Sequence, residues 1–541
     1  MNSAQGTRQR LVSCALVFAA AAQSIRAPLQ RSGSPGPPPS DAPNVLVIVL
    51  DDVGADKLEA FDRALAPPYA VTPRLDLLAR GDLASNGDGQ LRGGIRFQDF
   101  YVTPVCSPSR ACFQTGRYGF RTGMGYITDN GSPDNPPSAP SYLLPDSEVT
   151  LAELLKKGFF PQRSPYRCGA FGKWHLAYDY VDSSDYFGIN GAESHAVDNG
   201  YDCFFGTVGN VAGAKPVFDG VLDDHFSWRK VEQTAGGAPI IRHVDEWSAD
   251  TVRADAASWI DAETHAFFAW VAFNPPHAPF QVPPYELLSE ATRLELEALT
   301  PGPATIPPSP GDERHKLAAG DPRRPLYHRA TLEAVDTEIG MLLDEITPAK
   351  LRQTLIFVVC DNGTQMDAIQ PGHDATHGKD TVYQLGVRVP MIVAGCLVPP
   401  GEHDCDELVE AVDLWPTIGA VAGADADEAF LALGVPSNRV IDGRSFLPFI
   451  QDPGRPVTPE TCAFGQEFIP NGSPDCPPTN ERYITDGRYK YIRRQSSCVA
   501  LEEEFYDVLA DPEEQLDLFL TDPTHPVLLE LRSAMLALHP D

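Results

Sequence analysis

The chain has 541 residues, of which 43% are hydrophobic, enough to bury the core of one large domain with a smaller one beside it. Its 42 Lys and Arg residues stand against 74 Asp and Glu residues, which gives a formal net charge of −32. This excess argues against nucleic acid as a partner, because phosphate binding requires the opposite sign, and it weighs against long polyanionic substrates. A solvated acidic surface is the ordinary explanation of such a charge.

The N-terminal segment has the pattern of an export signal. Arg8 and Arg10 precede an apolar run over residues 11–22, so we assign residues 1–30 to a signal peptide. The run is too short to span a bilayer comfortably, and no later stretch predicts a stable membrane span. Residues 31–43 are rich in Ser, Gly and Pro and predict a flexible linker. We therefore expect an exported protein, whether secreted, periplasmic or lumenal.

The cysteines fit an oxidising compartment. The chain contains 11 of them, and export together with this number favours disulfide formation. Cys396 with Cys405, and Cys462 with Cys476, are close enough in sequence to pair. Spacing alone does not fix the connectivity.

Two predicted strands are each followed by oxygen-bearing side chains. Asn44–Leu50 and Thr354–Cys360 are continuous apolar runs, typical of strands buried on both faces of a parallel sheet. The residues that follow them are Asp51, Asp52, Asp361 and Asn362. Because sites in α/β sheets form at the carboxyl ends of parallel strands, we expect these side chains to converge. Such donors suit Ca²⁺ or Mg²⁺ better than zinc, although acidic pairs at strand ends are more often simply solvated.

Cys106 begins a segment that predicts a turn leading into a helix. Pro108 and Ser109 suit the first helical positions, and Thr115-Gly116 is a stop signal. A thiol at this place would have its anion favoured by the helix dipole and by Arg110. For a cysteine considered alone, a buried or disulfide-bonded role is the commoner one.

The rest of the chain alternates helices and strands. Helices are predicted over residues 149–159, 251–260, 326–346 and 413–421, and further strands over 168–174, 267–273 and 391–394. The strand at 168–174 carries Lys173 and is followed by His175. The strand at 267–273 leads into a turn where prolines flank His277 and hold it in a rigid loop. Alone, each of these histidines would more often be structural.

The C-terminal part has a different character. Residues 482–484 and 490–493 flank an Asp-Gly turn and predict a β-hairpin. Residues 503–507 then lead to a helix over Pro526–Leu538.

Taken together, the motifs resemble those of type I sulfatases, the formylglycine-dependent and arylsulfatase-like members of the alkaline-phosphatase superfamily. The matching segments are C-x-P-S-R-x4-T-G, D-D-x-G, G-K-W-H, P-H-x-P, and D-N-G followed by Lys379 upstream of G-x-R-V-P. The resemblance extends from residue 44 to about residue 538. Gln114 stands where the family usually has an apolar residue, and Gln384 where it usually has Glu. The C-x-P-x-R core that the converting enzyme recognises is intact.

This resemblance implies a fold and a division of the chain. The fold is α/β, with a large central, mostly parallel sheet flanked by helices, as in alkaline phosphatase, and a small C-terminal antiparallel sheet with a helix. It implies a catalytic domain over residues 44–455 and a small α+β subdomain over residues 456–541. Arg388, in the G-x-R-V-P segment, is expected to form a structural ion pair.

The resemblance also implies the cofactors and the site. A formylglycine-generating enzyme would convert Cys106 to Cα-formylglycine (3-oxoalanine) during maturation. Ca²⁺, rather than Mg²⁺, would bind to Asp51, Asp52, Asp361, Asn362 and residue 106. The family's remaining functional positions correspond to Arg110, Lys173, His175, His277 and Lys379: Lys173, Lys379 and His277 would contact sulfate, and His175 would contact the formylglycine.

The implied reaction is hydrolysis of an aryl or carbohydrate sulfate monoester to an alcohol and inorganic sulfate. A hydroxyl of the hydrated formylglycine attacks sulfur, His277 or Lys379 protonates the leaving oxygen, and His175 deprotonates the second hydroxyl to release sulfate. A phosphodiesterase or phosphonate monoester hydrolase of the same superfamily is the alternative. A third reading is a non-catalytic exported binding protein with unconverted Cys106. The organic half of the substrate stays open, because rim loops such as residues 199–220 and 300–325 carry the least signal.

Overall fold

The computed structural model of the protein describes residues 42–540, except residue 66 and residues 83–92, 129–142, 160–165, 178–191, 212–223, 300–316, 459–460, 473–476 and 497–499. The signal peptide predicted over residues 1–30 and nearly all of the predicted linker lie outside the described residues. Within the part that is described, no helix combines the length and the apolar character needed to cross a membrane.

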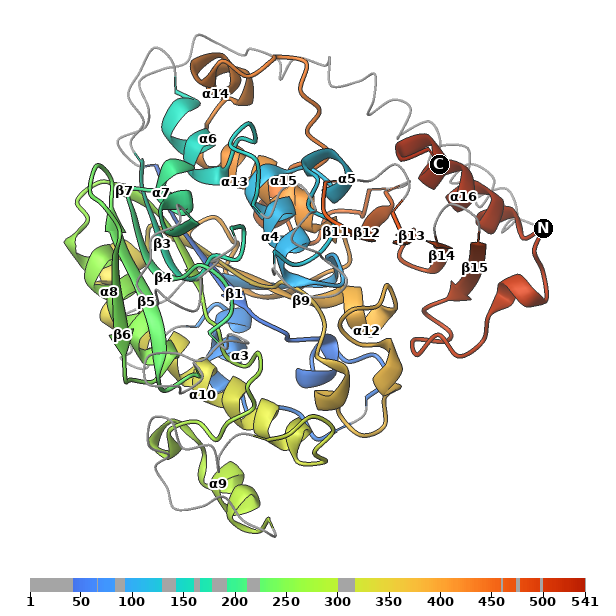
Figure 1. Ribbon diagram of the computed structural model, residues 1–541, viewed down its shortest axis with the longest axis horizontal. Coiled ribbons are helices and arrows are strands. Elements are labelled where there is room, and N and C mark those ends of the chain that lie inside the picture. Colours follow the sequence, from blue (N-terminus) through green and yellow to red (C-terminus); the bar gives the residue numbers. More distant parts are fainter. Residues whose placement is uncertain are drawn as a thin grey trace.

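A large mixed sheet forms the centre of the molecule (Figure 1). The described residues contribute eleven strands to it, in the order β10-β2-β9-β8-β1-β7-β3-β4-β5-β6, with β11 beside β2. The strands are β1 (Asn44–Leu50), β2 (Gly93–Tyr101), β3 (Tyr166–Lys173), β4 (Cys203–Thr207), β5 (Trp228–Thr234), β6 (Ile240–Val244), β7 (Ala266–Ala272), β8 (Thr354–Cys360), β9 (Arg388–Gly395), β10 (Gly401–Cys405) and β11 (Val409–Glu410).

The middle of this sheet is parallel and buried. β1 pairs in parallel with β8 on one side and with β7 on the other, and β7 continues in parallel to β3 and β4. Every residue of β1 and of β8 is buried, as the two apolar runs predict. β9 runs antiparallel to both β8 and β2, and the hairpin of β5 and β6 closes the opposite edge in antiparallel pairing.

Helices cover both faces of the sheet (Figure 1). One face packs against α3 (Pro73–Arg80), α8 (Ser248–Ala262) and α10 (Arg324–Glu345). The other packs against α4 (Cys106–Thr115), α6 (Leu151–Lys157) and α13 (Leu414–Ala422). The helices predicted over residues 149–159, 251–260, 326–346 and 413–421 are therefore present, with ends shifted by one to three residues.

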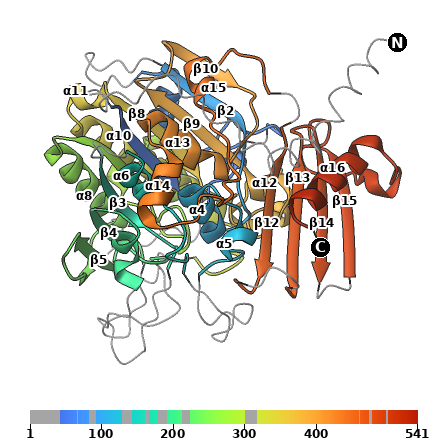
Figure 2. The ribbon, with the colours of Figure 1, turned by 90° about the horizontal axis from the view of Figure 1, so that it is seen from above.

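A second, four-stranded antiparallel sheet lies beside the main body (Figure 2). It consists of β12 (Ala463–Ile469), β13 (Thr479–Thr485), β14 (Tyr489–Ser496) and β15 (Ala500–Asp507), and α16 (Pro526–Leu538) packs on β13 and β14. The predicted hairpin is the β13–β14 pair. The sequence did not predict β12 as a strand, and it gave residues 503–507 only as a connection to the last helix. The predicted fold class is confirmed.

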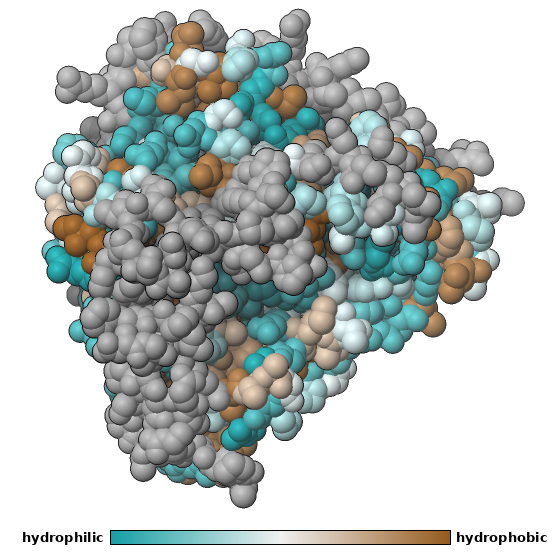
Figure 3. Space-filling view, viewed as in Figure 1, coloured by the Kyte–Doolittle hydropathy of each residue, from teal (hydrophilic) through white to brown (hydrophobic). Residues whose placement is uncertain are grey.

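One disulfide that the spacing allowed is not formed. Cys405 ends β10 and keeps a free thiol, while Cys396 directly follows β9. β2 lies between β9 and β10 in the sheet, and two strand spacings exceed the reach of a disulfide. Cys476 lies outside the described residues, so a bond to Cys462 stays a prediction. Figure 3 shows hydrophilic residues interspersed with smaller hydrophobic groups on one face.

Candidate active site

The carboxyl ends of the central strands bring the predicted residues to one edge of the sheet. Asp51 and Asp52 follow β1, and Asp361 and Asn362 follow β8. The two strand ends meet directly, because the backbone N–H of Asp52 donates to Asp361 Oδ1 at 3.3 Å and Asn362 Nδ2 donates to Asp52 Oδ1 at 2.8 Å. All four side chains are completely buried.

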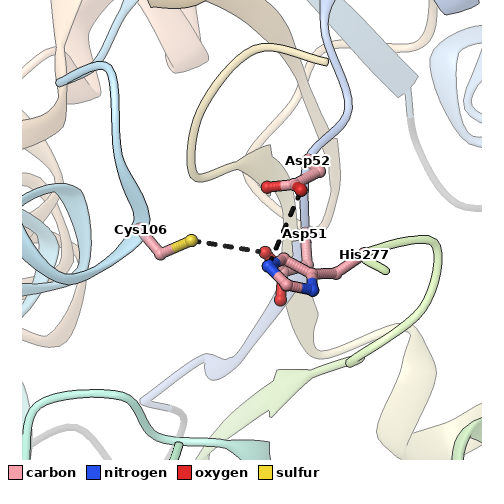
Figure 4. Close-up of side chains that lie close together, drawn as sticks. All are labelled: Asp51, Asp52, Cys106 and His277. Atoms are coloured by element: carbon pink, nitrogen blue, oxygen red, sulfur yellow. Dashed lines mark hydrogen bonds and ion pairs between the residues drawn. The ribbon is translucent and has the colours of Figure 1, made fainter. Parts of the chain in front are cut away.

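Cys106 lies at the first position of α4 and points at this edge (Figure 4). Its thiol donates to Asp51 Oδ1 at 3.6 Å, and Lys379 Nζ donates to its Sγ at 3.4 Å. One ligand atom from each of Asp51, Asp52, Cys106 and His277 lies within 4.8 Å of the other three. Residues more than 300 positions apart therefore form a single cluster.

Three cations neutralise the three buried carboxylates. Lys173, the last residue of β3, donates to Asp51 Oδ2 at 2.5 Å, and Lys379 donates to Asp52 Oδ1 at 2.7 Å. Arg110, one turn into α4, places Nε and Nη2 each 2.8 Å from Asp361 Oδ2, and its Nη1 donates to the backbone oxygen of Lys173. Buried charges persist only with such partners.

Burial and the nearby charges together shift the pKa values of the carboxyl groups and of the thiol in opposite directions. Burial is the largest single influence and opposes ionisation of Asp51 and Asp52, but the nearby cations together outweigh it, with Lys173 foremost at Asp51 and Lys379 at Asp52, so both pKa values fall, that of Asp52 to about 2. At Cys106, burial outweighs Lys173 and Lys379 and raises the pKa to about 12. The expectation of a favoured thiolate at residue 106 is therefore wrong: Arg110 faces Asp361 instead, and desolvation is the largest influence on the pKa of the thiol.

The two predicted histidines lie in different environments. His277 follows β7; its Nδ1 lies 2.8 Å from the backbone oxygen of Ala278, and its Nε2 lies 3.7 Å from Asp52 Oδ2. Because a carbonyl oxygen only accepts, Nδ1 of His277 carries a proton. His175 has a positive φ of 57°, and its buried Nδ1 has no hydrogen-bond partner among the described residues. Burial and then Lys173 lower the pKa of His175 well below its usual value, so the ring is neutral.

The site offers oxygen donors that a hard cation would satisfy. Asp52 Oδ2 and Asn362 Oδ1 are buried and have no hydrogen-bond partner in the described part of the chain. Buried oxygen atoms of this kind are rare unless a ligand or water completes them. Together with Asp51 and Asp361 they form the carboxylate and amide set that Ca²⁺ and Mg²⁺ prefer, so the residues fit the predicted ion.

Residues that the sequence did not single out support this cluster. His328, on α10, places Nε2 2.9 Å from the backbone oxygen of Asp52, which has a φ of 63°. His328 was missed because the α10 pattern marks that face as core; the only signal was a histidine at a core position. Gln114, the unusual residue of the Cys106 motif, accepts a hydrogen bond from the Tyr201 hydroxyl at 3.1 Å, which explains how the core admits it.

Two further positions near the site are structural. Gln384 donates from Nε2 to the Tyr101 hydroxyl at 3.2 Å. Arg388 Nε lies 3.5 Å from Asp99 Oδ1, and Arg388 also donates to backbone oxygens of Phe61 and Gln98. The expected structural ion pair of Arg388 is present.

Comparison with known proteins shows the family of the chain. A sequence model of the Sulfatase family matches residues 43–424. The steryl-sulfatase of Rattus norvegicus is 28% identical over 455 residues, which cover 76% of this chain and 71% of that protein. The N-acetylgalactosamine-6-sulfatase of Sus scrofa is 27% identical over 437 residues, covering 77% and 66%. A sulfatase from Bacteroides fragilis has the same fold, with a TM-score of 0.65, 19% identity, and coverage of 94% of this chain and 98% of that one.

The protein belongs to the class that has an alkaline-phosphatase-like fold, with this cluster at the edge of its central sheet. The chain belongs to the sulfatase family, and the predicted recognition is confirmed. Its relatives are sulfuric ester hydrolases, and this protein is an enzyme of that class.

Proposed function

We propose that the protein hydrolyses a sulfate monoester with a formylglycine made from Cys106 and a bound calcium ion. The observation that carries the proposal is the position of residue 106, between Asp51 Oδ1 at 3.6 Å and Lys379 Nζ at 3.4 Å. Hydrated formylglycine at this position would supply the nucleophilic hydroxyl. The buried thiol itself keeps its proton, since its pKa is about 12, and is a poor nucleophile.

The residues proposed to hold Ca²⁺ are Asp51, Asp52, Asp361 and Asn362, with the formylglycine at residue 106 as a further ligand. The ion would supply positive charge for the sulfate oxygens. Lys173 and Lys379 carry the remaining positive charge at the site. Burial opposes the charge of Lys379, but the surrounding acidic groups, Asp52 foremost, together outweigh it and raise the pKa of Lys379 well above its ordinary value, so Lys379 is a cation at neutral pH. Arg110 is completely buried behind the carboxylates, and we assign it to orienting Asp361 rather than to binding substrate.

His175 and His277 are the proposed proton carriers. The neutral His175 ring can accept a proton, which fits the base that releases sulfate. His277 donates its Nδ1 proton to the backbone oxygen of Ala278. The ring can therefore donate a proton from Nε2 only when it takes up a second proton. Either His277 or Lys379 is the proton donor to the leaving oxygen.

The proposal also covers how the chain is organised. It comprises an export signal at residues 1–30, a linker at 31–43, a catalytic domain at 44–455 and a subdomain at 456–541. The apolar run and the two arginines before it support export. N-terminal sequencing of protein recovered outside the cytoplasm tests it: a start near residue 31 supports cleavage, and an intact residue 1 contradicts it.

The nucleophile is tested by mass spectrometry of the tryptic peptide over residues 97–110, from a host that makes formylglycine. An aldehyde in place of the thiol at residue 106 supports the proposal, and an unmodified thiol in active enzyme contradicts it. Cys106→Ala is expected to abolish turnover of an aryl sulfate. Cys112→Ala is the matched control, because Cys112 is equally buried in the same helix and outside the site; it is expected to keep its turnover.

The substrate class is tested by turnover of an aryl sulfate beside an aryl phosphodiester. Preference for the sulfate supports the proposal, and preference for the phosphodiester identifies a phosphoesterase of the same superfamily. A panel of steryl, aryl and sugar sulfates then narrows the organic half. Fully converted protein that turns over none of these would support the binding-protein alternative.

A further inference from the structure

The turn that follows β12 holds a buried asparagine against the catalytic domain. Asn471 is completely buried. Its Oδ1 accepts hydrogen bonds from the backbone N–H groups of Gly125 and Tyr126, both at 2.8 Å, and its Nδ2 donates to the backbone oxygen of Ile127 at 3.2 Å. One side chain therefore binds backbone groups of three consecutive residues in a loop that lies 344 to 346 residues earlier in the sequence.

Backbone contacts extend the same attachment. Gly472 N–H donates to the oxygen of Gly123 at 2.7 Å, and Phe468 N–H donates to the oxygen of Gly125 at 3.1 Å. A Cβ on Gly125 would lie 2.3 Å from the Phe468 ring, so this approach requires glycine. β12 lies beside α5 (Gly119–Thr122), from which the loop emerges (Figure 2). Four of the residues 123–127 thus form hydrogen bonds with β12 or with the turn that follows it.

The other end of this loop contacts the active site. The backbone N–H of Thr128 donates to Ser107 Oγ at 3.1 Å, and Ser107 is the neighbour of Cys106 at the start of α4. The Thr128 hydroxyl donates to the backbone oxygen of Ala177 at 3.3 Å, two residues after His175. Residue 128 therefore connects the segment that carries the reactive residue with the segment that carries His175.

We propose that Asn471 is a positioning residue for sulfate ester hydrolysis: it fixes residues 123–128, and through Thr128 it sets the relative positions of residue 106 and His175. The turn that follows β12 thereby acts on the positions of the reacting residues. The proposal rests on the proposed function, because it takes residue 106 as the nucleophile and His175 as its base. It also excludes Asn471-Gly472-Ser473, formally a glycosylation sequon, as a glycan site, because all the hydrogen-bonding atoms of the Asn471 amide are directed into the protein.

The contribution of Asn471 follows from hydrogen-bond accounting. Removing its amide takes away the hydrogen-bond acceptor of the Gly125 and Tyr126 N–H groups and the donor to the Ile127 carbonyl oxygen, and the loss of such bonds inside a protein is unfavourable. The loop is then expected to open or to admit water. Because the loop contacts the Ser107 hydroxyl and the Ala177 backbone rather than the residues proposed to bind sulfate, its loosening should lower kcat more than it changes KM.

The test compares Asn471→Ala, Asn471→Asp and Asn480→Ala in the full-length, formylglycine-loaded enzyme, with activity normalised to formylglycine content by mass spectrometry. Asn480 is the matched control: it is buried in the same small sheet and accepts side-chain hydrogen bonds from Gln466 and Arg482, without contact to residues 123–128. Asn471→Ala should lower kcat on an aryl sulfate at least tenfold and speed amide exchange over residues 123–128. Asn471→Asp keeps both acceptor bonds, and an intermediate loss is expected.

Two outcomes would overturn the proposal: Asn471→Ala with wild-type exchange and kcat, or Asn480→Ala with an equal loss of kcat at equal stability. If Asn471→Ala does not fold, Asn471→Asp tests the proposal instead: wild-type kcat and wild-type amide exchange over residues 123–128 in that variant would overturn it. Wild-type enzyme without any sulfate ester turnover would contradict the proposed function instead; the exchange difference between Asn471→Asp and wild type would then show whether Asn471 fixes the loop.

Discussion

At the scale of single residues, the edge proposed to bind the cation depends on a strained backbone residue held by a buried partner. Asp52 has a φ of 63°, a conformation that is unfavourable for a residue with a Cβ. The His328 ring contacts this residue, with its Nε2 2.9 Å from the Asp52 carbonyl oxygen. Burial lowers the pKa of His328 to about 3, so the ring is neutral, with its single proton on Nε2. This contact fixes the peptide that orients the Asp52 carboxylate.

Replacing His328 is therefore expected to weaken cation binding as well as stability. His328→Leu leaves the buried carbonyl oxygen of Asp52 without a donor, and we expect the free energy of unfolding to fall by about 1–3 kcal/mol. Saturating Ca²⁺ should also raise the melting temperature less in the variant than in wild type. Calorimetry with Ca²⁺ and with chelator measures both effects. His328→Gln keeps a donor and should recover part of the loss; an unchanged Ca²⁺ effect in the Leu variant would contradict this role.

The two candidate proton donors can be separated by the leaving group. Lys379 contacts both Asp52 and Cys106, whereas His277 contacts the site only through Nε2. Loss of a general acid slows substrates with basic leaving groups most, typically by 10²–10⁴-fold. We expect His277→Ala to show this dependence across a series of aryl sulfates, and Lys379→Ala to lower kcat/KM about equally for all of them. The reverse pattern would assign the proton to Lys379.

At the scale of elements, the tight turn after β8 positions two of the proposed ligands. Gly363 follows Asp361 and Asn362, and its N–H donates to the oxygen of Gly386 at 2.9 Å. A Cβ at Gly363 would lie 1.8 Å from the backbone oxygen of Leu385. Only glycine allows the turn to approach the segment that precedes β9, so the close packing of two loops sets where Asp361 and Asn362 lie.

Gly363→Ala is expected to displace this turn. Overpacking against backbone lowers the free energy of unfolding by about 1–3 kcal/mol, and the shift of the ligands should weaken Ca²⁺ binding. Titration of Ca²⁺ into the chelated protein measures the affinity. Gly454→Ala serves as the control, because the nearest atom to its Cβ is a side-chain oxygen 3.9 Å away; equal Ca²⁺ affinity in both variants would contradict the assignment.

At the scale of the whole molecule, the C-terminal part braces the loop that carries Lys379. His373 Nδ1 lies 2.8 Å from Glu513 Oε1, and its Nε2 lies 3.4 Å from Asp62 Oδ2. The backbone N–H of Asp374 donates to the other oxygen of Glu513 at 2.9 Å. Burial disfavours the imidazolium, but hydrogen bonds to Asp62 and Glu513 outweigh it and raise the pKa of His373 to about 10. A buried cation thus joins three separate segments.

This network predicts a loss of stability in alkaline solution. The folded-state pKa of His373 lies above the unfolded value of about 6.5, so the folded protein binds the additional proton between these two values. Its stabilising effect is complete below pH 6.5 and is lost as the pH rises to about 10. The melting temperature of wild type should therefore fall more steeply than that of His373→Gln over this range. Parallel curves for the two proteins would exclude a stabilising His373 charge.

The amino-acid sequence by itself determined the central strands and the chemistry at their ends. Apolar runs such as Asn44–Leu50 can only be buried on both faces, and a strand of this kind must present the residues that follow it at the sheet edge. The motifs around Cys106, Lys173, His277 and Lys379 identified the family. The outer strands were not predicted: β5 and β6 contain mixed polar residues, and β12 is defined by its pairing with distant segments.

Only the tertiary structure decided the protonation states of these residues and the groups to which they are hydrogen-bonded. Nothing local to Cys106 indicates that burial raises its pKa to about 12, that Arg110 faces Asp361, or that His328 lies behind Asp52. The sequence likewise does not predict the hydrogen bonds between Asn471 and a loop more than 340 residues earlier. The physical reason is that sequence patterns encode local conformation and burial preference, whereas desolvation and hydrogen bonding depend on which distant groups fill the same space.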